Sequence, residues 1–234
     1  MIFVSKFVLE GVTLVSETEL LDALAPLTNQ EIPLATLQSL DIITTFYAEN
    51  DFLARALLPE QDIIDGVVRI KVIEGSLGQI VVNNEGQRVQ EERVMGFFDQ
   101  EISAGDPMNL SQLTRALSIL SSQPGLDFDA SLSAGEEEAG VDINVTTRDT
   151  PLLDFGAGIT NLGLRSTGEL QAILGLNVFN PLGLFDEAVL LSTLTEGSHF
   201  ILGDYNLPIG YSGLRVGTSF SHLDYEIVQE SLKE

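Results

Sequence analysis

The sequence predicts an α+β fold followed by an all-β part: two tandem β-α-α-β-β domains over residues 1–76 and 77–149, then antiparallel strands over residues 150–234. Two observations support this prediction. A strand–helix–helix–strand–strand pattern occurs twice, with a period of roughly 75 residues. After Asp149 the helical spacing ends, glycine becomes frequent, and short alternating segments are separated by turn residues.

The first repeat carries signals for all five elements. They are a strand over residues 3–9, a helix after Ser16, a helix from Pro33 that ends at Asn50, a strand over residues 53–58 and a strand after Gly66. Ser16 and Glu19 have the spacing of a capping box. The expected apolar stripe of the second helix is Leu34, Leu37, Leu40 and Tyr47. In the last strand Val68, Ile70 and Val72 share one face, opposite Arg69 and Lys71.

The second repeat has the same order. Its predicted elements are a strand over residues 78–83, a helix over residues 89–98, a helix after Asn109, a strand over residues 128–132 and a strand from Gly140. Asn109 is the expected helix cap, and Pro124-Gly125 ends the second helix. In the last strand Val141, Ile143 and Val145 alternate with Asp142, Asn144 and Thr146. Each repeat can therefore form a two-layer α+β domain.

Five strand-like segments follow Asp149. They cover residues 152–160, 169–179, 187–195, 199–207 and 214–222. Their length and two-residue period are those of transmembrane β-strands, which need ~9–11 residues each. A soluble β-sandwich has the same alternation, so periodicity alone leaves both structures open.

Composition excludes several classes of protein and site. The chain has 11 basic and 35 acidic residues, a net charge of −24, and no cysteine. It therefore repels nucleic-acid phosphates, and it contains no disulfide or zinc-binding thiolate. A hydrophobic fraction of 44% argues against wholesale disorder. The first seven residues lack the regions of a signal peptide and are typical of a strand.

The sequence contains no catalytic constellation, phosphate-binding loop or cofactor motif. We expect no metal site at His199 and His222, which lack partner ligands at a suitable spacing. Glu136–Glu138 is interpreted as a solvated hairpin rather than a cation site. Asp127 and Asp129 share one face of a strand, and we expect that face to meet solvent rather than a metal.

Several motifs together resemble one family over nearly the whole chain. Residues 58–75 are similar to the first-domain signature of the haemolysin- and filamentous-haemagglutinin-type transporters of two-partner secretion. Within that segment the matching residues are Pro59, Gln61, Gly66, Glu74 and Gly75. A leucine-rich helix followed by Pro124 and Gly125 resembles the family's second domain. The motif containing Asn180, Pro181, Gly183 and Asp186 resembles the opening strands of its barrel.

The resemblance implies two polypeptide-transport-associated (POTRA) domains and the start of an outer-membrane barrel. It implies a Gram-negative-type outer membrane with the POTRA domains in the periplasm. The implied partners are an unfolded secreted client of β-helical character and, through the complete barrel, membrane lipid. No nucleic acid, nucleotide or other cofactor and no enzymatic activity are expected. The family has a signal peptide, a plug helix and a barrel of roughly sixteen strands, none of which is complete here, so we expect a fragment.

Open strand edges suggest where a client binds. In the β-α-α-β-β order the penultimate strand can lie at the sheet edge, where an extended client pairs with it by β-augmentation. The expected client-binding residues of the first domain are Leu53, Ala54, Arg55, Ala56, Leu57 and Leu58, with Leu37, Leu40 and Thr44 in an adjacent groove. Those of the second domain are Phe128, Asp129, Ala130, Ser131 and Leu132. Alternatively, Leu37, Leu40 and their neighbours are simply core.

Three functions remain open at this point. The first is a transporter component that recognises an unfolded secreted partner and feeds it to the pore. The second is an outer-membrane barrel-assembly factor of the same superfamily. The third is a soluble interaction module without a transport role.

Overall fold

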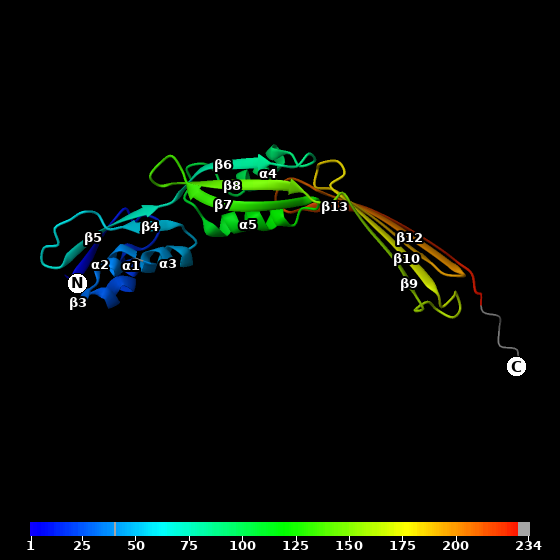
Figure 1. Ribbon diagram of the computed structural model, residues 1–234, viewed down its shortest axis with the longest axis horizontal. Helices are drawn as coiled ribbons and strands as arrows, with labels where there is room; N and C mark the ends of the chain where they lie inside the picture. The colour runs from blue at the N-terminus through cyan, green and yellow to red at the C-terminus, as the bar shows by residue number, and fades with distance from the viewer. Residues whose placement is uncertain (40, 229–234) are drawn as a thin grey trace. The chain divides into compact units, whose positions relative to one another are not determined.

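The computed structural model describes residues 1–39 and 41–228 (Figure 1). These residues form two compact units. One comprises residues 1–81, 98–118 and 130–145, and the other comprises residues 82–97, 119–129 and the described residues from 146 onward. None of the described helices combines the length and apolar character needed to cross a membrane.

The first repeat folds in the predicted β-α-α-β-β order, with additions. Its elements are β1 (Ile2–Val4), β2 (Lys6–Glu10), α1 (Glu17–Leu24), the 3-10 helix η1 (Ala25–Leu27), β3 (Gln30–Ile32), α2 (Leu34–Ser39), α3 (Asp41–Glu49), β4 (Ala54–Leu57) and β5 (Val67–Glu74). Ser16 caps α1, since its hydroxyl accepts a hydrogen bond from the Glu19 amide at 3.4 Å. This part of the helix prediction is confirmed.

The prediction of a single strand over residues 3–9 is wrong. The segment divides at Ser5, whose amide donates to the Gly66 carbonyl oxygen at 2.7 Å. Strand β1 then pairs with β3 in a small antiparallel ribbon, and β2 joins the main sheet. Gly66 has φ +71°, and a Cβ there would lie 2.8 Å from the Ser5 nitrogen, so glycine is required at this junction.

The second predicted helix, from Pro33 to Asn50, coincides with α2 and α3. Leu40, which lies between them in sequence, is outside the described residues. Leu37 and Tyr47 are fully buried, whereas Leu34 is 46% exposed and is no part of the core. The predicted apolar stripe is therefore correct for Leu37 and Tyr47 and wrong for Leu34, which stands at the solvent-facing start of α2.

The main sheet of the first repeat has the order β2-β5-β4, with β5 in the centre. Strand β2 is parallel to β5 and β4 is antiparallel to it. Val68, Ile70 and Val72 of β5 are buried and lie in the core, as the alternation predicts. Figure 1 shows α1, α2 and α3 on one side of this sheet. Strand β4 forms its edge.

The second repeat has the same order. Its elements are β6 (Ser76–Asn84), α4 (Glu91–Asp99), α5 (Leu110–Ser121), β7 (Leu126–Ala134) and β8 (Gly140–Asp149). Asn109 caps α5, since its Oδ1 accepts from the Gln112 amide at 3.0 Å. The sheet order is β6-β8-β7, so β7 lies at an edge. Asp142 is only 8% exposed, although its alternation predicts a polar face, because its carboxylate accepts from the amide and side chain of Gln79.

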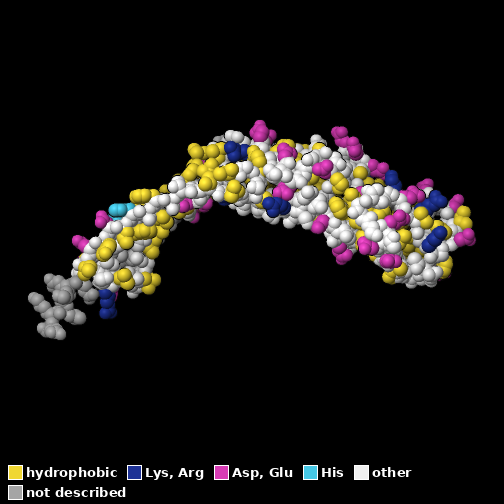
Figure 2. Space-filling model, turned by 180° about the vertical axis from the view of Figure 1, so that it is seen from behind, with side chains coloured by type: hydrophobic (Ala, Val, Ile, Leu, Met, Phe, Trp, Pro, Cys, Tyr) yellow, Lys and Arg dark blue, Asp and Glu magenta, His cyan; other side chains and the backbone are white. Residues whose placement is uncertain are grey.

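Five antiparallel strands follow in one sheet. They are β9 (Leu153–Thr160), β10 (Gln171–Phe179), β11 (Glu187–Leu194), β12 (Ser198–Pro208) and β13 (Arg215–Tyr225), each paired with its sequence neighbour. Each coincides with a predicted segment. Large apolar side chains such as Phe155, Ile159 and Phe220 are at least two-thirds exposed. Figure 2 shows hydrophobic side chains along this sheet.

Candidate functional site

Strand β4 offers its outer edge to another chain. The Leu53 carbonyl oxygen accepts from the Gly75 amide at 2.8 Å, which directs the backbone of Leu53 toward the β5 side. Because backbone direction alternates along an antiparallel strand, the polar groups of Arg55 and Leu57 also face β5, and those of Ala54 and Ala56 face outward. Ala56 therefore presents an N–H donor at the open edge.

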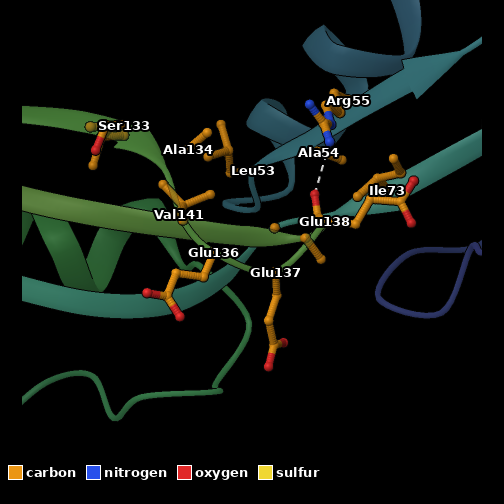
Figure 3. A pocket seen from close by; sticks show the side chains of 15 residues that line it. Leu53, Ala54, Arg55, Ile73, Ser133, Ala134, Glu136, Glu137, Glu138 and Val141 are labelled. Carbon is orange, nitrogen blue, oxygen red and sulfur yellow. Dashed lines mark hydrogen bonds between the residues drawn. The ribbon is translucent and has the colours of Figure 1, made fainter.

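A groove of about 490 Å³ lies between this strand and the hairpin that joins β7 to β8 (Figure 3). Its apolar walls are formed by Leu53, Ala54, Ile73, Leu132, Ala134 and Val141. Ile73 is 7% exposed although it shares a strand face with the exposed Arg69 and Lys71. Residues 53–55 of the first predicted edge thus meet Leu132 of the second predicted edge in one groove.

Backbone hydrogen bonds fix the floor of this groove. The Leu53 amide donates to the Met108 carbonyl oxygen at 3.2 Å, and the Met108 amide donates to the Gly75 carbonyl oxygen at 2.8 Å. A Cβ at Gly75 would lie 3.1 Å from the Leu53 carbonyl oxygen and 3.4 Å from Val141 Cγ2. The sequence motif residue Gly75 therefore permits the close approach of the two repeats.

Two basic residues tether the hairpin across the groove. The Arg55 guanidinium donates to the Glu138 carbonyl oxygen at 2.8 Å, the contact drawn in Figure 3, and the Lys71 ammonium pairs with the Glu138 carboxylate at 2.8 Å. The hydrogen bond from Lys71 lowers the pKa of Glu138. Glu136, Glu137 and Glu138 are all exposed, as the interpretation of a solvated hairpin expects, and Glu138 in addition has a partner 67 residues distant in sequence.

The predicted helical side of the client groove is not supported. Leu37 is fully buried in the core, which was the alternative interpretation, so it offers no surface to a client. Leu40 lies outside the described residues. Thr44 is exposed but does not line the groove beside β4. The walls come instead from the hairpin, because alternation along one strand gives no information about which distant loop covers it.

The second predicted edge lies within β7. The prediction named Phe128, Asp129, Ala130, Ser131 and Leu132, and all five belong to the edge strand. Arg148 lies 2.8 Å from the Asp129 carboxylate and 3.9 Å from that of Asp127. It also pairs with Glu85 at 3.0 Å. The two aspartates thus face a cation from the neighbouring strand.

The first-domain motif organises the sheet around the groove. The Glu74 carboxylate accepts hydrogen bonds from the amides of Thr13 and Leu14 at 2.7 and 2.8 Å, from the Thr13 hydroxyl, and from Tyr47 at 2.7 Å. Burial raises the pKa of Glu74, and these hydrogen bonds outweigh burial and lower it. Burial, and then the hydrogen bond and negative charge of Glu74, raise the pKa of Tyr47. Glu74 therefore holds the loop before α1 against α3.

The motif of residues 180–186 forms the turn between β10 and β11. Asn180 and Asp186 are fully buried. Asn180 Oδ1 accepts from the Phe185 amide at 2.7 Å, and Asp186 accepts from the Leu182 amide at 3.1 Å and from the Tyr205 hydroxyl at 2.8 Å. Gly183, which follows Pro181 and Leu182, has φ +72° and would place a Cβ 2.7 Å from the Arg88 carbonyl oxygen. Pro124 and Gly125 follow α5, and Gly125 packs against Asn180.

Arg88 is an organising residue that sequence reasoning missed. Its guanidinium donates to the Phe179 carbonyl oxygen at 2.8 Å and to the Thr150 carbonyl oxygen, and it lies 3.5 Å from the Asp149 carboxylate. Burial by itself would raise the pKa of Asp149. Hydrogen bonds from the Gln87 and Arg88 amides, together with the Arg88 charge, outweigh burial and lower this pKa. No local pattern marks Arg88, because its partners lie 61 to 91 residues away.

Comparisons with known proteins agree with this architecture. The sequence profile of the family described as POTRA domain, ShlB-type, matches residues 2–75. The chain is 26% identical over 213 residues to the heme/hemopexin transporter protein HuxB of Haemophilus influenzae. This alignment covers 89% of this chain and 38% of HuxB. It is 28% identical over 233 residues to the outer membrane transporter CdiB of Escherichia coli. This alignment covers 95% of this chain and 38% of CdiB.

Solved structures show the same relationship. CdiB from Escherichia coli superposes with a TM-score of 0.69 at 26% identity, over 96% of this chain and 42% of that one. BamA from Haemophilus ducreyi lacking POTRA domains 1–3 superposes with a TM-score of 0.58 at 17% identity, over 96% of this chain and 43% of that one, and shows the fold alone. The chain spans 38% of the length of HuxB and of CdiB.

The five antiparallel strands correspond to barrel strands of CdiB, and within the described residues they form an open sheet. The homologues are transporters rather than enzymes. Residues 2–75 are therefore a POTRA domain of the ShlB type, and the chain is homologous to the outer-membrane transporters of two-partner secretion.

Proposed function

We propose that this chain acts in protein transport, as part of an outer-membrane transporter that binds an unfolded secreted partner and passes it to a β-barrel pore. Residues 1–76 and 77–149 would be the periplasmic POTRA domains, and residues 150–234 the first barrel strands. The homology to HuxB and CdiB supports the transport role. The observation that carries client binding is the open edge of β4 beside an apolar groove.

The proposed recognition works through the main chain. An extended client segment lies antiparallel or parallel to β4 and exchanges hydrogen bonds with the outward-facing backbone of Ala54 and Ala56. Such pairing demands little of the client's sequence, which suits a transporter that receives a long unfolded polypeptide. Client folding outside the cell would supply the driving force for movement.

Photo-crosslinking tests client capture. The photo-reactive residue p-benzoylphenylalanine is placed at Leu57, which is 40% exposed on β4, and at the exposed Glu17 of α1 as the control. The probe is the N-terminal domain of a secreted haemagglutinin-like protein, unfolded in urea and diluted onto the chain in detergent. We expect crosslinks from position 57 and none from position 17. Equal crosslinking from both positions would contradict recognition at the edge of β4.

A backbone variant tests the mode of binding. Ala56→Pro removes the outward N–H donor, whereas Ala56→Thr keeps it and favours a strand. We expect Ala56→Pro to weaken capture of the same probe and Ala56→Thr to preserve it. Circular dichroism checks that both variants fold. Undiminished capture by a folded Ala56→Pro variant would exclude pairing through this donor.

A further inference from the structure

The groove beside β4 is apolar on its walls and acidic at its rim. Leu53, Ile73 and Val141 lie on the walls, and Glu136 and Glu137 belong to the hairpin that borders it. In Figure 3 the carboxylates of Glu136 and Glu137 extend away from the apolar side chains of Leu53 and Ala134. A ligand that enters the groove therefore meets hydrocarbon inside and negative charge at its mouth.

The glutamates of the hairpin differ in whether they have a basic partner. Glu138 already pairs with Lys71. Neither Glu136 nor Glu137 forms a salt bridge with any residue in the described ranges 1–39 and 41–228, and both are exposed. Arg55 is the cation that lines the groove, and it donates to a carbonyl oxygen of the hairpin. Two carboxylates thus remain available to a cation from outside.

The groove also borders two strand edges. Residues 53–55 reach it from the edge strand β4, and residues 132–134 reach it from the edge strand β7. An extended segment that pairs with β4 places alternate side chains on opposite faces, about 7 Å apart along each face. The groove and the hairpin rim lie on the same face, that of Arg55 and Ile73. Lysine or arginine on this face can lay its aliphatic stem on the apolar walls and extend its charge to the rim, while the alternate apolar side chains lie on the face of Ala54 and Ala56, beside the core.

We infer that this groove selects an extended client segment in which apolar residues alternate with lysine or arginine. This inference rests on the proposed function and adds a sequence preference to it: the strand edge supplies affinity, and Glu136 and Glu137 favour basic side chains. Charge complementarity at a partly exposed rim acts on the rate of encounter and on specificity. The preference should therefore weaken as salt rises, because the Debye length falls from about 10 Å at 0.1 M to 3 Å at 1 M.

Peptide binding to the whole chain in detergent tests this inference. The probes are three fluorescein-labelled decapeptides with alternating Val-Lys, Val-Thr and Val-Glu sequences. We expect the order of affinity Val-Lys, then Val-Thr, then Val-Glu. The double variant Glu136→Gln/Glu137→Gln should weaken Val-Lys binding about tenfold and leave Val-Thr binding unchanged. The matched control Glu91→Gln/Glu92→Gln removes the same charge from two exposed residues of α4 and should leave all three affinities unchanged.

The outcomes separate this inference from the proposed function. Equal affinity for Val-Lys and Val-Thr, or equal weakening by both double variants, would overturn the basic preference and leave edge binding intact if Ala56→Pro still reduces Val-Thr binding. Failure of all three peptides to bind, together with failure to capture the unfolded secreted protein, would overturn both. A crosslink from p-benzoylphenylalanine at Leu132 to the Val-Lys peptide would place the ligand in the groove, and its absence would exclude this site.

Discussion

The side-chain amide of Gln61 pairs with the backbone of Arg69 as a strand residue would. Gln61 Oε1 accepts from the Arg69 amide at 2.8 Å, and Nε2 donates to the Arg69 carbonyl oxygen at 2.7 Å. The register of β4 and β5 ends at Leu57↔Lys71, and its continuation would place Pro59 opposite Arg69. Proline has no N–H to donate. Gln61 therefore completes the ladder that Pro59 interrupts, which gives both motif residues a structural role.

Replacing Gln61 tests this substitution of side chain for backbone. Gln61→Ala removes both hydrogen bonds and should lower the local stability of the β4–β5 pairing by about 1–2 kcal/mol. Hydrogen exchange measured by NMR or mass spectrometry should show faster exchange at the Arg69 amide. Gln100→Ala, at an exposed residue after α4, is the control and should leave that rate unchanged. An unaltered Arg69 rate in Gln61→Ala would contradict the assigned role.

Glu74 predicts how the stability of the first POTRA domain depends on pH. The folded state lowers its pKa, so its stabilising contribution is fully present above the unfolded value of about 4.3 and is lost as pH falls through the lower folded value. Glu74→Gln removes this charged acceptor. The difference in unfolding free energy between the native chain and Glu74→Gln should be largest at pH 7 and should narrow below about pH 4.

Urea unfolding followed by circular dichroism at pH 7 and pH 3.5 measures this difference. Glu49→Gln, at an exposed position at the end of α3, is the control. A stability difference for Glu74→Gln that stays constant between the two pH values would mean that the charge on Glu74 is not what holds the loop.

Arg88 should be needed for the connection between β8 and the following strands. Lysine keeps the charge of Arg88 but lacks the planar fork that reaches the carbonyl oxygens of both Phe179 and Thr150. Arg88→Lys should cost about 2 kcal/mol, because it leaves carbonyl oxygens near a charged donor unpaired. Limited proteolysis near Thr150 should become faster. The control is Arg165→Lys, at a side chain that is 80% exposed, and it should not change the rate of cleavage. Equal rates of cleavage near Thr150 in the two variants would contradict the prediction.

Replacing Gly96 with alanine should lower the stability of the native chain, although the same replacement ordinarily stabilises a helix. Alanine in place of glycine ordinarily stabilises a helix by about 1 kcal/mol. In α4, however, a Cβ at Gly96 would lie 2.3 Å from the ring of Tyr211, which packs edge-on against Phe97 at 5.2 Å. Gly96→Ala should therefore destabilise the native chain and stabilise a Tyr211→Ala variant. Thermal unfolding of the four chains measures this coupling, and additive effects would show that the ring moves aside freely.

The sequence alone predicted the doubled domain pattern because its signals are local. The Ser16 and Asn109 caps and the alternation in β5 follow from spacing within one element, and the five C-terminal strands follow from a two-residue period bounded by turns. Where a tertiary contact decided the local structure, the prediction was wrong. Ser5 divided the first strand because its amide bonds to Gly66, 61 residues later.

The sequence therefore determined the doubled order of the main strands and helices, and that β4 could stand at an edge. Only the tertiary structure decided what lies beside that edge. The hairpin with Glu138 covers the strand through contacts to Arg55 and Lys71, and it replaces the expected helical wall at Leu37. The physical reason is that hydrophobic periodicity records which face of an element is buried, whereas the identity of the covering segment depends on chain closure over more than 60 residues.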